Sequence, residues 1–169
     1  MFENTKLTFQ QRLVWERLHD GLKTIELAND SLESRAGKVI AGSTGVVSAI
    51  AGFNLLPDAI AATGRAESVI LVALCASVLV MFWFAAELWS QRPICVPGDG
   101  DVDDLYNEYI AKTPDEAFNN ALMDMAKAFE HAKWVNKAKG KELRNMYIVL
   151  QGQIVIVGLG VLVKAFCPS

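Results

Sequence analysis

The sequence has little charge, and its few cysteines do not pair. Charged residues make up 21% of the 169 residues, below the roughly 25% of an average soluble domain, whereas hydrophobic residues make up 52%. The three cysteines, Cys75, Cys95 and Cys167, form no CxxC pair, which excludes a disulfide framework and gives no sign of a zinc or redox motif. So apolar a composition also excludes a disordered chain.

Catalytic and cofactor motifs are lacking too. The two histidines, His19 and His131, have no cysteine or second histidine at metal-ligand spacing, and the sequence contains no P-loop, dinucleotide fingerprint, HExxH or nucleophile elbow. The acidic stretch 97–104 begins like a calcium-binding loop but lacks the glycine and glutamate that such a loop requires. We therefore expect no enzymatic activity, no cofactor and no metal site.

What the sequence does have is three long runs without a charged residue, at 39–57, 68–86 and 146–163. A bilayer core of about 30 Å is crossed by roughly 20 mostly apolar helical residues. Three such runs in so short a chain disfavour an ordinary soluble globule. They predict an all-α membrane protein with three transmembrane helices.

The remaining segments are mostly helical by their own patterns. Thr8 and Gln11 have the spacing of a helix-capping box, and leucines and an isoleucine then recur at helical spacing until Gly37, where we expect this amphipathic helix to end. Its apolar stripe packs against the rest of the protein or a sister subunit, or lies on lipid. Thr113, Pro114 and Glu116 predict a second helix start, with no strong breaker before the third run, so we expect one continuous helix there.

Basic residues near the ends of the runs give the orientation. Five of them precede the third run, Arg35 and Lys38 precede the first, and the short loop between the first two runs has only Arg65. Because positive charge prefers the cytoplasmic side, the N-terminal segment and the insert are predicted to be cytoplasmic, and the short loop and the C-terminal tail external. In order, the predicted segments of the chain are a cytoplasmic amphipathic helix (1–38), the first span (39–57), an external loop (58–67), the second span (68–86), a cytoplasmic helical insert (87–145), the third span (146–163) and an external tail (164–169).

Two sets of residues inside the spans are candidates for helix contact or for lining a pore. Small residues share one face of the first span, where they form either a packing seam or the wall of a narrow pore. These are Gly42, Gly45, Ala49 and Gly52. Gln151 and Gln153 lie about 200° apart on a helix, so at most one of them can share a face with a given partner. Each either bonds to another helix or lines water.

The insert ends in a concentration of positive charge that could bind phosphate groups. Four cations follow at helical spacing, Lys133, Lys137, Lys141 and Arg144, with Lys139 close by. The same residues would also serve as the positive-inside anchor of the third span, or would contact anionic lipid headgroups.

Two stretches of the sequence are distinctive. The segment 29–38 (NDSLESRAGK) runs into a span rich in Gly, Ser and Ala, and within the stretch 106–150 the segment 136–144 (NKAKGKELR) leads into the last span. With these residues the layout resembles a family of small bacterial membrane proteins, the SLATT- and Pycsar-type effectors of anti-phage systems. The resemblance covers the architecture of nearly the whole chain.

The resemblance implies a multi-pass protein of the bacterial inner membrane whose N-terminus is cytoplasmic. Such effectors form homo-oligomers, here a tetramer or similar, and respond to a cyclic nucleotide or, in Hailong-type systems, a short oligonucleotide made by a partner nucleotidyltransferase. The implied function is a ligand-gated channel or pore that depolarises the membrane. The alternative is a non-conducting scaffold or accessory subunit that docks a cytoplasmic partner.

Overall fold

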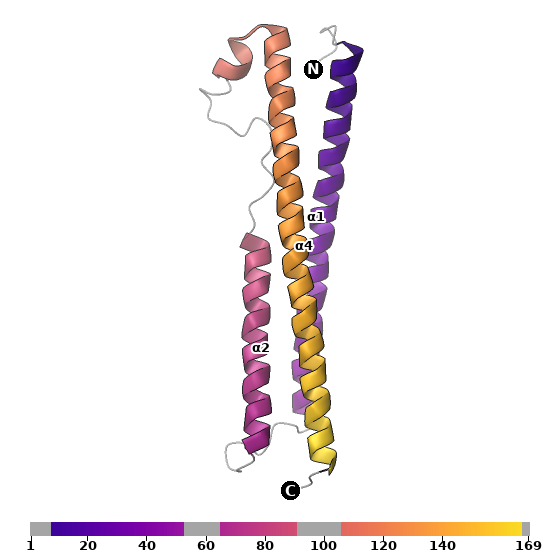
Figure 1. Cartoon of the computed structure of the whole chain (residues 1–169), viewed down its shortest axis with the longest axis vertical. Helices are drawn as coiled ribbons and strands as arrows, with labels where there is room; N and C mark the ends of the chain where they lie inside the picture. The colour runs from indigo at the N-terminus through magenta and orange to yellow at the C-terminus, as the bar shows by residue number, and fades with distance from the viewer. Residues whose placement is uncertain (1–7, 53–64, 91–105, 167–169) are drawn as a thin grey trace. The chain divides into compact units, whose positions relative to one another are not determined.

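The computed structural model of the chain describes residues 8–52, 65–90 and 106–166 (Figure 1). Within these residues the chain is all-helical and has no strand. It forms three long helices, α1 (Phe9–Gly52), α2 (Arg65–Ser90) and α4 (Pro114–Phe166), with a π-helical turn, η1 (Tyr106–Ile110), before α4. The acidic stretch, the predicted external loop up to residue 64 and the end of the C-terminal tail lie outside the described residues.

Both predicted capping boxes are confirmed. At the start of α1 the Thr8 amide donates to Gln11 Oε1 at 3.0 Å, and the Gln11 amide donates to Thr8 Oγ1 at 3.3 Å. At the start of α4 the Thr113 amide and hydroxyl donate to Glu116 Oε2 at 3.2 and 2.8 Å. These two hydrogen bonds, first that of the side chain and then that of the backbone, lower the pKa of Glu116 below its ordinary value of 4.5. The reciprocal bonds satisfy amides that a helix start leaves without partners.

The predicted end of the first helix near Gly37 is wrong. α1 continues without interruption to Gly52. A glycine costs a helix only about 1 kcal/mol relative to alanine, and two residues close to this one, Ala36 just before it and Val39 two positions after it, are buried to 0% and 2% exposure. The packing of these two neighbours outweighs the weak propensity of Gly37. The predicted boundary at residue 38 therefore falls inside one helix, whereas the continuous helix expected from the insert into the third run is observed as α4.

The chain divides into two compact units, one formed by Met1–Asp30 with Arg92–Ala138 and the other by Ser31–Gln91 with Lys139–Ser169. In the first unit the rings of Trp15 and Phe118 lie 5.8 Å apart, and the Phe129 ring covers Gly21 so closely that a Cβ there would come within 2.6 Å of it. Trp15 precedes Gly21 on α1, and their partners Phe118 and Phe129 follow in the same order on α4. The two helices therefore run parallel in this unit.

The second unit repeats the parallel arrangement and adds α2. Gly42 faces the Leu150 side chain, and Ser43 bonds to Gln153 farther along both helices. Gln153 also bonds to Ser77 of α2, whereas Gly160 faces Ile70, which precedes Ser77. A later residue of α4 therefore contacts an earlier residue of α2, which means that α2 runs antiparallel to the other two helices of this unit (Figure 1).

A single heptad row marks the buried side of α4 from Phe118 to Gln153. Residues seven apart are buried in both units, with exposures between 0% and 7%. They are Phe118, Met125, Ala132, Lys139, Met146 and Gln153. A seven-residue repeat keeps one seam of a helix facing a parallel neighbour, as in a coiled coil. We call these six residues the heptad row.

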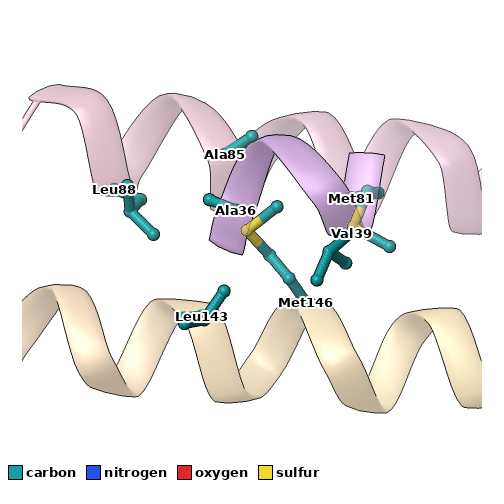
Figure 2. Packing of buried hydrophobic residues seen from close by; sticks show 7 residues of the cluster. All are labelled: Ala36, Val39, Met81, Ala85, Leu88, Leu143 and Met146. Atoms are coloured by element: carbon teal, nitrogen blue, oxygen red, sulfur yellow. The ribbon is translucent and has the colours of Figure 1, made fainter. Parts of the chain in front are cut away.

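The largest apolar cluster lies in the second unit, between all three helices. It consists of Ala36 and Val39 from α1, Met81, Ala85 and Leu88 from α2, and Leu143 and Met146 from α4. Figure 2 shows Leu143 and Met146 pointing from α4 toward the other two helices. Small and large side chains alternate across the contact, which lets the helices approach closely.

Among the described residues, α2 over Val72–Ser90 and α4 over Pro114–Leu162 are long and apolar enough to cross a membrane. Core helices of soluble proteins meet the same criterion, but they are mostly buried. Here only 22% of the apolar stretch of α2 and 11% of that of α4 is buried. α1 does not meet the criterion, since its described part ends at Gly52, inside the first predicted span.

Thr113→Ala should loosen the first turn of α4, because it removes both the hydroxyl that caps the helix and one donor to Glu116. Replacing a threonine cap by alanine costs about 1 kcal/mol. Amide hydrogen exchange at residues 115–117 should therefore speed up about fivefold, at ~1.4 kcal/mol per tenfold. Lys112→Ala, which removes an exposed side chain next to the cap, is the matched control, and equal exchange in the two variants would contradict the capping role.

Candidate functional site

The most buried polar side chain of the second unit is Gln153, which is 0% exposed and links all three helices. Its Oε1 accepts a hydrogen bond from Ser43 Oγ of α1 at 2.8 Å, and its Nε2 donates to Ser77 Oγ of α2 at 3.2 Å. Ser77 in turn donates to the Leu74 carbonyl at 2.7 Å. Where water is absent, such a side chain is stable only if its amide is bonded on both sides. We call Ser43, Ser77 and Gln153 the polar node.

Gln151, only two residues before Gln153, has a different environment. Its side chain is exposed, and it makes no hydrogen bond to any residue in the described ranges. The two glutamines thus point in different directions, as their spacing requires. The structure places Gln153 in packing between helices and leaves Gln151 on the outer surface of α4.

The small residues predicted to form one face of α1 divide in the same way. A Cβ on Gly42 would lie 3.6 Å from Leu150, so Gly42 belongs to the contact between α1 and α4. A Cβ on Gly45 would meet nothing within 4 Å. Ala49 is partly buried, and the surroundings of Gly52 are outside the description. The four residues therefore do not share one contact within a single chain.

The outer surface of the second unit changes in character from helix to helix. On α2 it consists of large apolar side chains, such as Val72 (67% exposed), Leu79 (71%) and Phe82 (58%). On α1 it consists of Ala41, Thr44, Gly45 and Ser48, together with Val47 at 38% exposure. The Thr44 and Ser48 hydroxyls donate to the carbonyls of Ile40 and Thr44, four residues earlier. We call Ala41, Thr44, Gly45 and Ser48 the outer face of α1.

Four of the five predicted phosphate-binding cations are exposed residues of α4, two of them in the first unit and two in the second. They are Lys133, Lys137, Lys141 and Arg144, which we call the basic row. Their spacing of four, four and three residues keeps them on one face of the continuous helix. The Lys133 ammonium also lies 4.3 Å from the centre of the Phe129 ring, a cation–π contact. The other three are open to solvent or ligand.

The structure does not bring Lys139 to this face. Lys139 is 3% exposed and occupies the heptad row, and its Nζ lies 2.5 Å from Glu33 Oε1 of α1. A buried ammonium needs a carboxylate partner, because the cost of removing it from water is large. Lys139 is therefore part of the contact between α1 and α4 in the second unit, and its charge is already neutralised.

Sequence reasoning missed the pairing of Lys139 with Glu33 and left open whether Gln153 bonds to another helix or lines water, although a signal for both contacts exists. Both residues of α4 fall at steps of seven from Phe118, Met125 and Ala132, three apolar residues of the insert that recur at the same spacing. Extending that period through the polar residues would have placed both in the seam. Treating the insert and the span as separate segments hid the repeat.

Comparison with known proteins adds no relative to this description. The chain matches no protein family, and no curated protein or solved structure is significantly similar to it.

Gln153→Leu should destabilise the second unit by about 1–3 kcal/mol, because it removes two hydrogen bonds between helices, each worth about 0.6–1.7 kcal/mol in a membrane. Gln151→Leu is the matched control and should change the stability of a single chain by less than about 0.5 kcal/mol, because its side chain makes no contact of this kind. The measurement is reversible unfolding of monomeric protein in mixed micelles. Equal effects of the two substitutions would mean that the polar node does not hold the helices together.

Proposed function

We propose that this chain is the subunit of an oligomeric channel or pore in the bacterial inner membrane, gated by a nucleotide or oligonucleotide that binds on the cytoplasmic side. Opening or closing the pore would change the membrane potential, and depolarisation would serve anti-phage defence. The second unit would contain the three membrane-crossing helices. The observation that carries the proposal is the distribution of polar and apolar side chains in that unit.

That distribution is the reverse of a water-soluble bundle. The polar node is inside, and large apolar side chains of α2 and α4 are outside, including Trp83 at 69% and Leu159 at 54% exposure. Apolar area costs about 25 cal/mol per Å² when it faces water, so an unaccompanied unit of this kind would be insoluble. Lipid removes that cost, and tryptophans suit the boundary between lipid and water.

The outer face of α1 supports assembly. Its small and hydroxyl-bearing residues gain little from contact with lipid tails, whereas they allow another helix to approach closely. Three helices per chain cannot enclose a water-filled path, so a pore needs several copies. The outer face of α1 is therefore poorly suited to lipid, and we assign it to contact between copies.

The directions of the helices support the proposed topology. Within the second unit α1 and α4 are parallel and α2 is antiparallel, as three successive crossings require. The basic residues Lys141 and Arg144 lie near the start of the predicted third span and favour the cytoplasmic side for that end. Because α1 runs parallel to α4 in this unit, the N-terminal end of the first predicted span is then on the cytoplasmic side as well.

The basic row supports a polyanionic ligand. Charge-assisted hydrogen bonds to phosphate are strong, and several exposed cations can each bind one phosphate group of a ligand that has several; Lys137, Lys141 and Arg144 are exposed. α4 continues without a break from these residues into the third predicted span, so binding could act directly on that helix. The defence role and the nucleotide nature of the ligand come from the resemblance in layout.

A scaffold that docks a cytoplasmic partner is the second candidate, and one observation favours it. The first unit exposes large apolar side chains, among them Phe9 (80%), Leu27 (63%) and Trp134 (62%). In the proposed topology these residues are in the cytoplasm and not in lipid. A partner protein or another copy would have to cover them.

Gly45→Leu should prevent assembly and abolish conductance without disturbing the single chain. The space around Gly45 is open within 4 Å, so a leucine fits the isolated unit but separates neighbouring copies. The measurements are oligomer counting after purification in detergent and single-channel recording in a planar bilayer. Native oligomer size together with native conductance would show that the outer face of α1 does not meet another copy.

The matched control for this variant is Ala76→Leu, which adds the same side chain to an exposed position on α2. There the new leucine joins other large apolar groups that face lipid, and both measurements should stay unchanged. If the unaltered protein assembles but never conducts under any nucleotide, the scaffold becomes the better explanation.

Lys133→Glu/Lys137→Glu should weaken nucleotide binding by about two to four powers of ten. Each charged contact to phosphate is worth roughly 1.5–3 kcal/mol, and ~1.4 kcal/mol corresponds to a tenfold change. Binding of a short oligoadenylate and of cyclic nucleotides to the solubilised oligomer can be followed by calorimetry at several salt concentrations. The affinity for the oligonucleotide should fall steeply with salt.

The control variant Lys112→Glu/Lys127→Glu makes the same charge change at two other exposed lysines of the insert. Its affinity should stay within a few-fold of the native value. If both double variants lose affinity equally, the effect is one of overall charge, and if neither does, the ligand binds elsewhere, for instance along Arg12, Arg17 and Lys23 of α1.

A further inference from the structure

We propose that Gln151 on α4 of one copy contacts Thr44 on the outer face of α1 of the next copy. Repetition of this contact closes a ring in which α1 and α4 alternate. The inference rests on the proposed function, since it takes the second unit to be an assembled membrane protein. It adds the identity of the two surfaces that meet.

The first reason is the state of the Gln151 amide. Its side chain belongs to the sixth residue of the 18-residue run without charge (146–163), is exposed, and has no hydrogen-bond partner in the described ranges. An amide that faces lipid tails loses the hydrogen bonds that it makes to water. Glutamines in membrane helices therefore bond to another helix or face water.

The second reason is that Thr44 offers what Gln151 lacks. The Thr44 hydroxyl is exposed and uses its single hydrogen to donate to the Ile40 carbonyl at 3.0 Å. Its oxygen keeps lone pairs that can accept a hydrogen bond, and the Gln151 amide group can donate one. Gly45 beside Thr44 leaves open space in which the second helix can come close.

The third reason is depth. In the single chain Ser43 bonds to Gln153, and Gly42 faces Leu150, so Thr44 and Gln151 lie within about one helical turn, 5.4 Å, of the same level along the helix axes. Copies arranged in a ring about the membrane normal keep every residue at its own depth. A residue of one copy can meet only residues at similar depth in its neighbour, and this pair meets that condition.

The remaining outer surfaces fit such a ring. Gly158, seven residues after Gln151 on the same side of α4, also has nothing within 4 Å of a built Cβ and would continue the contact. The exposed side of α2 consists of large apolar residues and stays toward lipid. The contact joins different surfaces of the two copies, so it forms a closed ring only if the rotation between copies closes.

Cross-linking between copies tests the contact. Two tagged versions without native cysteines (Cys75→Ser, Cys95→Ser, Cys167→Ser) are co-expressed, one carrying Thr44→Cys and the other Gln151→Cys. Mild oxidation in membranes should link the two tags in a large fraction of the protein. Thr44→Cys with Leu79→Cys, a position 71% exposed on α2, is the matched control and should remain unlinked.

Other outcomes overturn the contact. Linking of Gln151→Cys copies to each other but not to Thr44→Cys would mean that like surfaces meet. Rapid reaction of Gln151→Cys with a membrane-impermeant thiol reagent would place it in a water-filled path, and neither linking nor reaction would place it in lipid. In each of these cases the proposed pairing is wrong.

A second measurement covers the event that cysteine variants assemble poorly. Gln151→Leu should weaken association of copies about threefold to fifteenfold, the range for a hydrogen bond between membrane helices. Full native association of Gln151→Leu would contradict the contact. Conductance separates this inference from the proposed function. Copies that become linked but never conduct would support the contact and contradict the channel function. Oligomers that conduct but do not become linked would support the channel function and contradict the contact.

Discussion

The arrangement of the second unit depends on two hydrogen bonds of one side chain. Gln153 accepts from Ser43 and donates to Ser77, so a single amide fixes the level of α1 and α2 against α4. Apolar contacts alone tolerate sliding and rotation, because one methyl group can replace another at small cost. A buried amide has no such freedom, since a shift of one residue on any helix leaves it unbonded. The polar node thus sets the register that the apolar cluster of Ala36, Met81 and Met146 then fills.

The heptad row contains two polar residues, Lys139 and Gln153, and each has a different kind of partner. Lys139 is paired with Glu33 and Gln153 is bonded to serines, and fourteen residues separate them on α4. Coiled coils use one polar residue in an otherwise apolar seam to specify alignment at some cost in stability. Here an ion pair does so at one level and an uncharged amide at the other. An uncharged amide is the cheaper choice where no water is present.

Much of the local structure could be predicted from the sequence, because caps and periods act over a few residues. Thr8 and Thr113 marked the two helix starts, and the absence of a strong breaker between Thr113 and the third run predicted the continuous α4. Gly37 misled the prediction, since its low helix propensity was outweighed by the burial of Ala36 and Val39. The partner of Lys139 was beyond reach for a different reason. Glu33 lies 106 residues away, and only the parallel alignment of α1 and α4 brings it near.

The division of roles between the two glutamines shows the same limit. Their angular separation was available from helix geometry, but the sequence does not state which of the two faces inward. Burial of Gln153 follows from its step of seven residues after Met146, and that step gains meaning only once the seam is known. The basic row was simpler to predict, because four cations at helical spacing share a side wherever the helix packs.

The polar node also limits how such a protein could move. A slide of α4 by one residue is a translation of 1.5 Å with a rotation of 100°, and it would break both bonds of Gln153 at once. Piston or screw motions of a single helix are therefore opposed by the node itself. Displacements that keep Ser43, Ser77 and Gln153 together carry α1, α2 and α4 of the second unit as one rigid body. Gating in an assembly of these chains would then be a tilt or rotation of the second unit of each copy as a whole, with the sliding surfaces between the second units of neighbouring copies.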